Sequence, residues 1–175
     1  IMHANNEVGT LQPISELSNL ARKHNIIMHT DAAQSVGKVP TDVDTLGVDL
    51  LSIAGHKLYA PKGVGALYVR QSLDLWKFCH GAGQESGARA GTENVTGIVG
   101  LGKACEIAAR NLIDSMKQME NLRDQLHEGL FSQLGDIRLN GHPQQRLPNT
   151  LSVSVKGIEA NKILEKIKDE VAASA

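Results

Sequence analysis

One short stretch of the sequence places an amine where it could do chemistry. His56 and Lys57 stand between two apolar runs, residues 50–54 and 64–69, that are typical of strands. Burying an ammonium group at the end of a strand costs free energy unless an opposite charge or hydrogen bonds compensate for the lost water. Lys57 is therefore either a solvated loop lysine or an amine kept for covalent chemistry with an electrophile.

An acid ends the apolar run that precedes this stretch. Residues 26–30 predict a short buried strand that closes on Asp31, and Gln34 follows about one helical turn later. The carboxyl ends of parallel strands meet at one edge of an α/β sheet, where ligands bind. Asp31 and Lys57 then form either a structural ion pair or a cofactor site. In the second case Lys57 forms a Schiff base with pyridoxal phosphate, Asp31 keeps the pyridine nitrogen protonated, and Gln34 reaches the ring hydroxyl.

Hydrophobic periodicity predicts the elements that position these groups. Pro13 opens a helix, and the pattern is helical again from residue 94 to 134, as one long helix or two. Strands are expected at 26–30, 48–55, 65–70 and 150–155, and a last helix at 160–171. Strands alternating with helices through short loops indicate an α/β fold. A boundary near residue 110 divides the chain into units 1–110 and 111–175.

The composition narrows the classes of function. The 18 basic and 19 acidic residues give a net charge of −1, and aromatic residues are scarce, so a nucleic-acid partner is not expected. No apolar run is long enough for a membrane span. Cys79 and Cys105 form neither a disulfide framework nor a metal pair, and the histidines lack the spacing of metal ligands. A cytoplasmic location is the default, with an organelle interior left open.

Four motifs occur in order and resemble one known family. The chain is similar to the NifS/IscS-like cysteine desulfurases and the related selenocysteine lyases, which are class V aminotransferases of PLP fold type I. The motifs are MHANNEVGTLQPI, HTDAAQSVGK, DLLSIAGHKLYAPKGVGALYVR and RAGTENV. The resemblance implies part of an aspartate-aminotransferase-like large domain with a mainly parallel sheet (1–110). Part of an α+β small C-terminal domain (111–175) would follow it.

The resemblance also implies roles around pyridoxal 5'-phosphate. Lys57 would be the Schiff-base lysine, and Asp31 would pair with the pyridinium nitrogen. Gln34 would meet the phenolic oxygen, and Asn6 would lie near that oxygen and the substrate carboxylate. His56 would contact the cofactor phosphate. Amides suit a ring oxygen and imidazole suits a phosphate, but Asn6 and His56 could equally be a loop amide and a solvated imidazole.

The resemblance at Thr92 implies a homodimer. In the family, the matching threonine reaches the phosphate held by the partner subunit. The competing interpretation is a helix N-cap, because a helix is expected to begin near this residue. Ala54 departs from the family, where a serine often stands, so one hydroxyl contact to the phosphate would be missing.

By this resemblance the parent protein would convert L-cysteine to L-alanine. Lys57 would move the Cα proton, and the sulfur would pass to an enzyme cysteine as a persulfide, then to an acceptor protein for iron–sulfur cluster assembly. Both ends of the sequence look cut, since the family's nucleophilic cysteine loop and N-terminal region fall outside it, and the isolated piece is expected to be inactive. Selenocysteine lyase and an inactive remnant that binds a partner are the alternatives. The NNEVGT and RAGTEN motifs argue against an ordinary class V aminotransferase.

Overall fold

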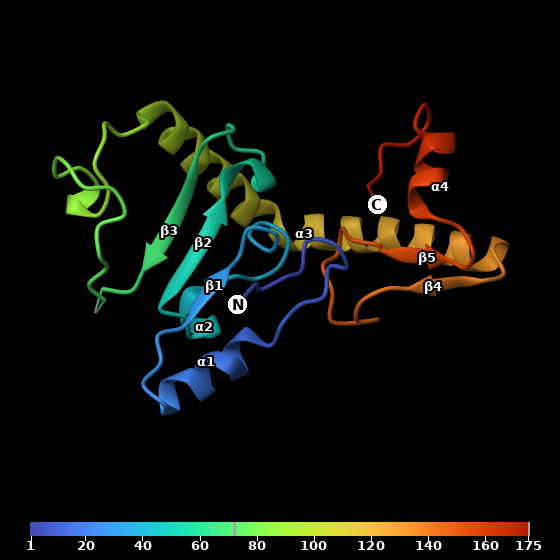
Figure 1. Ribbon diagram of the computed structural model, residues 1–175, viewed down its shortest axis with the longest axis horizontal. Helices are drawn as coiled ribbons and strands as arrows, with labels where there is room; N and C mark the ends of the chain where they lie inside the picture. Colours follow the sequence, from blue (N-terminus) through green and yellow to red (C-terminus); the bar gives the residue numbers. More distant parts are fainter. Residues whose placement is uncertain (72, 175) are drawn as a thin grey trace.

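The computed structural model describes residues 1–71 and 73–174 of the chain. A three-stranded sheet with its helices lies at one end and a two-stranded sheet at the other, and one long helix joins them (Figure 1). In chain order the elements are α1 (Ile14–Lys23), β1 (His29–Asp31), α2 (Val43–Leu46), β2 (Leu50–Ala54), the 3₁₀ turn η1 (Gly55–Leu58), β3 (Gly65–Val69), the 3₁₀ turn η2 (Glu85–Gly87), α3 (Val95–Gln133), β4 (Ile137–Leu139), β5 (Val153–Val155) and α4 (Ala160–Ile167).

The larger sheet has the order β1–β2–β3 and mixes both directions of pairing. β1 runs parallel to β2, with Asp31 opposite Ser52. β2 and β3 are antiparallel, with Leu50 opposite Val69. Residues 55–64 form too short a connection for the crossover that a parallel strand needs, so β3 must return in the opposite direction. In the described part of the chain the sheet is therefore mixed, with β3 antiparallel beside the parallel pair β1 and β2.

The first residues of the chain extend this sheet beyond β1. The Asp31 amide donates to the carbonyl of Ile1 at 3.0 Å, and the His3 amide donates to the carbonyl of Asp31 at 2.8 Å. Met2 and Asp31 form a parallel bridge. The segment 1–3, β1 and β2 therefore run side by side in one direction, which determines where their carboxyl ends lie.

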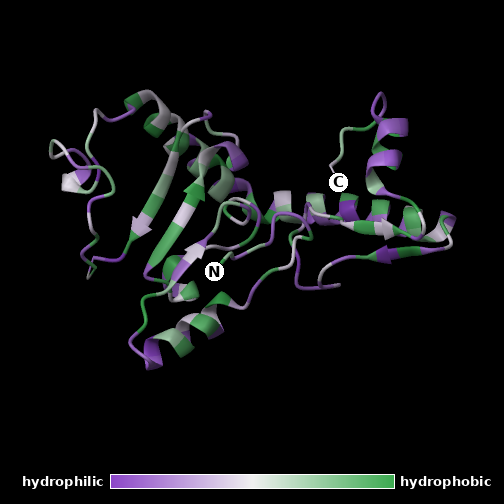
Figure 2. Ribbon diagram, viewed as in Figure 1, coloured by the Kyte–Doolittle hydropathy of each residue, from purple (hydrophilic) through white to green (hydrophobic). Residues whose placement is uncertain are grey.

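A buried apolar cluster holds α1 and α2 against the larger sheet, and apolar residues follow β2 along much of its length (Figure 2). The cluster consists of Ile14, Met28, Ala32, Leu46, Val48 and Leu51. The helix predicted after Pro13 is confirmed as α1. The strand predicted at 26–30 starts later: Ile26 and Ile27 are 60% and 57% exposed, and the register with β2 begins at His29. The sequence pattern was wrong for Ile26 and Ile27, since the strand preference of such residues depends on packing against neighbours and these two are exposed.

The helical pattern of residues 94–134 folds as the single helix α3. Its first turns pack on η1 through a cluster that contains Leu58 and Leu101, with Cys105 half-buried beside it. The helix continues through residue 110 without a break. The two-domain division at that residue remains a prediction.

The end of the chain forms a small α+β unit beyond α3. β4 and β5 pair antiparallel, and β5 alternates half-buried Val153 and Val155 with exposed Ser154. The strand predicted at 150–155 is thus confirmed over its last three residues. α4 is shorter than the expected 160–171 and ends at Ile167. Within residues 1–71 and 73–174, no helix is both long and apolar enough to cross a membrane.

Candidate cofactor site

Three segments that run in the same direction end at one edge of the larger sheet. The segment 1–3 leads into the turn that carries Asn6, β1 ends at Asp31, and β2 leads through Ala54 into η1 with Lys57. The parallel pairing of β1 with β2 is the arrangement that the sequence predicted for Asp31 and Lys57. The carboxyl ends of parallel strands are where α/β proteins bind ligands, so this edge is the candidate site.

Local hydrogen bonds orient Asp31 at this edge. Its carboxylate Oδ1 accepts from the amide of Ala33 at 2.9 Å, and its side chain is half-buried. Within the part of the chain that the structure describes, no lysine or arginine nitrogen lies within the 4.0 Å of an ion pair with Asp31. The structural ion pair between Asp31 and Lys57 is therefore not formed. The Asp31 carboxylate can still accept a hydrogen bond from a ligand.

Gln34 lies in a series of turns after β1 and not on the expected helix. The Val36 amide donates to the carbonyl of Ala32 at 3.0 Å, so one helical turn forms. Gly37 then adopts a φ of +77°, which favours glycine and ends the turn. Gln34 is half-buried, three residues beyond Asp31, so both side chains belong to the same short connection.

The η1 turn presents His56 and Lys57 between two buried anchors. Gly55 and Leu58 are buried, whereas His56 and Lys57 are exposed. A Cβ atom at Gly55 would lie 2.6 Å from the carbonyl oxygen of Val64, so only glycine fits this position without a shift of the backbone. The turn therefore holds the two polar residues outward at the end of β2.

The turn after β1 is joined to η1 by Lys38, which the sequence reasoning missed. Its Nζ donates to the carbonyl of Gln34 at 3.2 Å and to the carbonyl of Lys57 at 3.3 Å. Burial lowers the pKa of Lys38, and the nearby charge of Lys57 lowers it further. The signal available in the sequence was a lysine one short turn after Gln34, in the HTDAAQSVGK motif.

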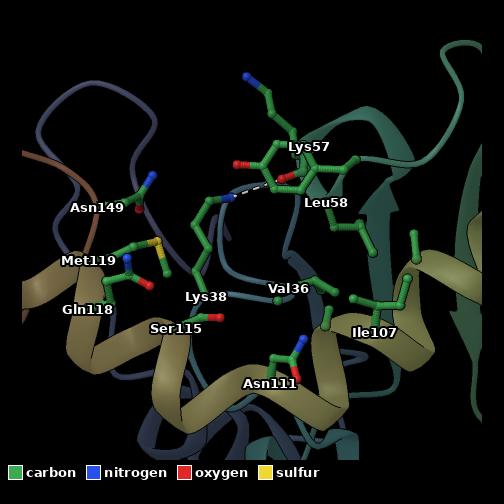
Figure 3. Close-up of a pocket in the computed structure, with 14 residues that line it drawn as sticks. Val36, Lys38, Lys57, Leu58, Ile107, Asn111, Ser115, Gln118, Met119 and Asn149 are labelled. Carbon is green, nitrogen blue, oxygen red and sulfur yellow. Dashed lines mark hydrogen bonds between the residues drawn. The ribbon is translucent and has the colours of Figure 1, made fainter.

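A cavity of about 540 Å³ lies between this junction and α3, on the far side of the Lys57 backbone. Figure 3 shows Lys38 reaching the Lys57 carbonyl, while the Lys57 side chain extends away from the cavity. Of the six predicted site residues, only Lys57 lines it. The cavity is therefore distinct from the space at the sheet edge that Asp31 and the Lys57 amine would share.

Asn6 and Thr92 are both exposed. Asn5 closes the turn near the start of the chain, because its Oδ1 accepts from the amides of Glu7 and Val8 at 2.9 and 2.8 Å, and Asn6 is left exposed. Thr92 is also exposed, on the segment that extends beyond β3, away from β1 (Figure 1). The structure thus does not bring Thr92 to the edge that carries Asp31 within one copy of the chain.

The N-cap interpretation of Thr92 is wrong. Asn94 caps α3, with its Oδ1 accepting from the amide of Gly97 at 3.1 Å. The helix begins at Val95, so Thr92 lies outside the capping position. Its hydroxyl has no capping role to fulfil.

His3 is a buried histidine near Asp31 that sequence reasoning left unassigned. It is 7% exposed, and its Nδ1 has no hydrogen-bond partner among the described residues. Burial lowers its pKa, so the neutral imidazole is favoured. Within residues 1–71 and 73–174, no cluster of three or more His, Cys, Asp or Glu side chains is arranged to hold a metal ion.

Comparison with known proteins identifies the family of this arrangement. The family model described as aminotransferase class-V matches residues 1–174. The chain belongs to the class V aminotransferases. It is 49% identical over 164 residues to a protein named cysteine desulfurase IscS from Dictyoglomus turgidum, a match that covers 94% of this chain and 42% of that protein.

Solved structures agree with this assignment. A NifS-like protein superposes with a TM-score of 0.91 at 42% identity, covering 97% of this chain and 46% of that one. SspA, solved in complex with cysteine, superposes with a TM-score of 0.75 at 37% identity, covering 98% of this chain and 46% of its own. The predicted family and PLP fold type I are confirmed. The chain spans less than half the length of these relatives.

Proposed function

We propose that this chain is the cofactor-lysine portion of a pyridoxal-phosphate-dependent cysteine desulfurase. The observation that carries the proposal is that Asp31 ends β1 and Lys57 lies in the turn after β2, the strand that pairs parallel with β1. Relatives named cysteine desulfurase match over 94% of the chain, which supports the substrate class. The activity belongs to the whole protein, in which units 1–110 and 111–175 would be parts of the large and small domains.

The groups at this edge fit pyridoxal 5'-phosphate. The cofactor needs an amine for its aldehyde, a carboxylate for its ring nitrogen and polar donors for its oxygens. Lys57 is exposed, and the Asp31 carboxylate has no cationic partner among the described residues. Gln34 and His56 lie in the same two turns and would serve the ring oxygen and the phosphate. When bound, the cofactor supplies an electron sink for negative charge at the substrate Cα.

Each residue at this edge would then have a separate role in the reaction. Lys57 would hold the cofactor aldehyde and would move the proton at the substrate Cα. Asp31 would hold a proton at the ring nitrogen, and Asn6 would orient the substrate carboxylate. In the whole protein, L-cysteine would leave as L-alanine, with the sulfur taken by an enzyme cysteine as a persulfide and passed to an acceptor protein.

The site would be completed by a second copy of the chain. Thr92 is exposed, lies away from the Asp31 edge and does not cap α3. A hydroxyl on a projecting segment is free to contact the phosphate held by a partner subunit. This position supports a homodimer with shared sites.

Covalent trapping tests the proposal. The whole protein is loaded with pyridoxal 5'-phosphate, reduced with borohydride and mapped by peptide mass spectrometry. We expect a pyridoxyl group on Lys57, its loss in Lys57→Ala, and its retention in Lys62→Ala, which removes an exposed lysine from the same loop. A label on another lysine, or a covalent label persisting in Lys57→Ala, refutes the assignment.

A further inference from the structure

We propose that Lys38 is a positioning residue that holds the two cofactor-binding turns at a defined separation. The inference rests on the proposed function, because it concerns the same sheet edge. It adds a residue that binds neither cofactor nor substrate and acts through the backbone of Gln34 and Lys57.

The contacts of Lys38 reach both turns at once. One ammonium group donates to the carbonyl of Gln34 at 3.2 Å and to the carbonyl of Lys57 at 3.3 Å. The first carbonyl belongs to the turn that follows Asp31, and the second belongs to η1. The dashed line in Figure 3 marks the bond that crosses to η1.

The strand pairing alone does not reach these turns. Along the sheet, the last backbone hydrogen bond between the segments of β1 and β2 is donated by the Ala32 amide to the carbonyl of Ser52 at 3.0 Å. Beyond that point, in the described part of the chain, Lys38 is the polar link between the two connections. Proposed site residues on each side depend on this link for their relative position.

Burial distinguishes Lys38 from an ordinary surface lysine. The side chain is half-buried, and desolvation lowers its pKa, so the ammonium group has given up water. No carboxylate of the described residues forms an ion pair with it. The backbone carbonyls therefore stand in for the lost water, and hydrogen bonds that involve a charged group are stronger than neutral ones.

The test uses the whole protein with Lys38→Met, Lys38→Arg and the matched control Lys62→Met. Cofactor loading is followed by borohydride trapping on Lys57 at increasing concentrations of pyridoxal 5'-phosphate. Visible circular dichroism reports the orientation of the bound chromophore, and thermal unfolding reports the fold. We expect Lys38→Met to need about tenfold more cofactor for half-loading, the equivalent of one lost charge-assisted bond, and to change the dichroism.

The conservative variant separates positioning from packing. Lys38→Arg retains donors of the same charge and should restore most of the loading. Equal loading curves and dichroism for Lys38→Met and Lys62→Met refute the inference, as does a lower unfolding temperature with unchanged loading. If the unaltered protein shows no adduct on Lys57, the proposed function itself fails. If the adduct forms but its yield does not change in the Lys38 variants, only this inference fails.

Discussion

The start of α3 offers a direct test of which residue caps the helix and which is free for the cofactor. Asn94→Ala removes the oxygen that accepts from the Gly97 amide at 3.1 Å. Loss of an asparagine cap costs about 1 kcal/mol, within a range of about 0.5–2 kcal/mol. Gly97 is buried, and the first turn of α3 contains no acidic residue to offset the loss, so we expect a cost of roughly 1–2 kcal/mol in the free energy of unfolding.

Thr92→Ala should behave in the opposite way. The side chain is exposed and outside the cap, so its removal should change the free energy of unfolding by less than about 0.5 kcal/mol. Its hydroxyl is proposed to meet the phosphate in the partner subunit, so loading with pyridoxal 5'-phosphate should weaken.

Urea unfolding and cofactor titration of the whole protein measure the two effects side by side. Asn94→Asp serves as the control, because aspartate also caps helices and its charge suits the helix N-terminus. The reasoning is refuted if Thr92→Ala is as destabilising as Asn94→Ala, or if Asn94→Ala unfolds at the urea concentration of the unaltered protein.

Two further predictions concern the backbone of η1 and the buried histidine. Gly55→Ala should cost about 1–3 kcal/mol and reduce adduct formation on Lys57, because its Cβ would lie 2.6 Å from the Val64 carbonyl oxygen; Gly102→Ala, with open space on α3, should instead raise the urea midpoint. The pKa of His3 is lowered from 6.5 by burial, so the unfolded chain binds the proton more readily. The contribution of neutral His3 to the free energy of unfolding should be fully present above pH about 6.5. It should fall as the pH drops from there toward the folded-state pKa. His3→Gln should flatten this loss in urea unfolding measured from pH 7.5 to 5, while the exposed-site control His24→Gln should keep it; an unchanged slope in His3→Gln contradicts the assignment.

Local patterns in the sequence were sufficient for several elements. Pro13 followed by helically spaced apolar residues produced α1, and the alternation in residues 150–155 produced β5. Asp31 and the His56–Lys57 pair could be placed at neighbouring strand ends, because strand runs and their flanking polar residues are encoded in adjacent positions. The four motifs also carried enough residues, in the right order, to indicate the family by themselves.

Other features depended on contacts between distant segments. Ile26 and Ile27 are apolar but lie outside β1, since no neighbour covers them. The direction of β3 followed from the shortness of its connection, and the pairing of residues 1–3 with β1 joined segments that the sequence separates by 28 positions. The bridge made by Lys38 could not be inferred from its own turn, because one of its two acceptors lies 19 residues further along the chain. Residue type and spacing thus define which groups are available, whereas burial and hydrogen bonding between remote segments decide which of them share a site.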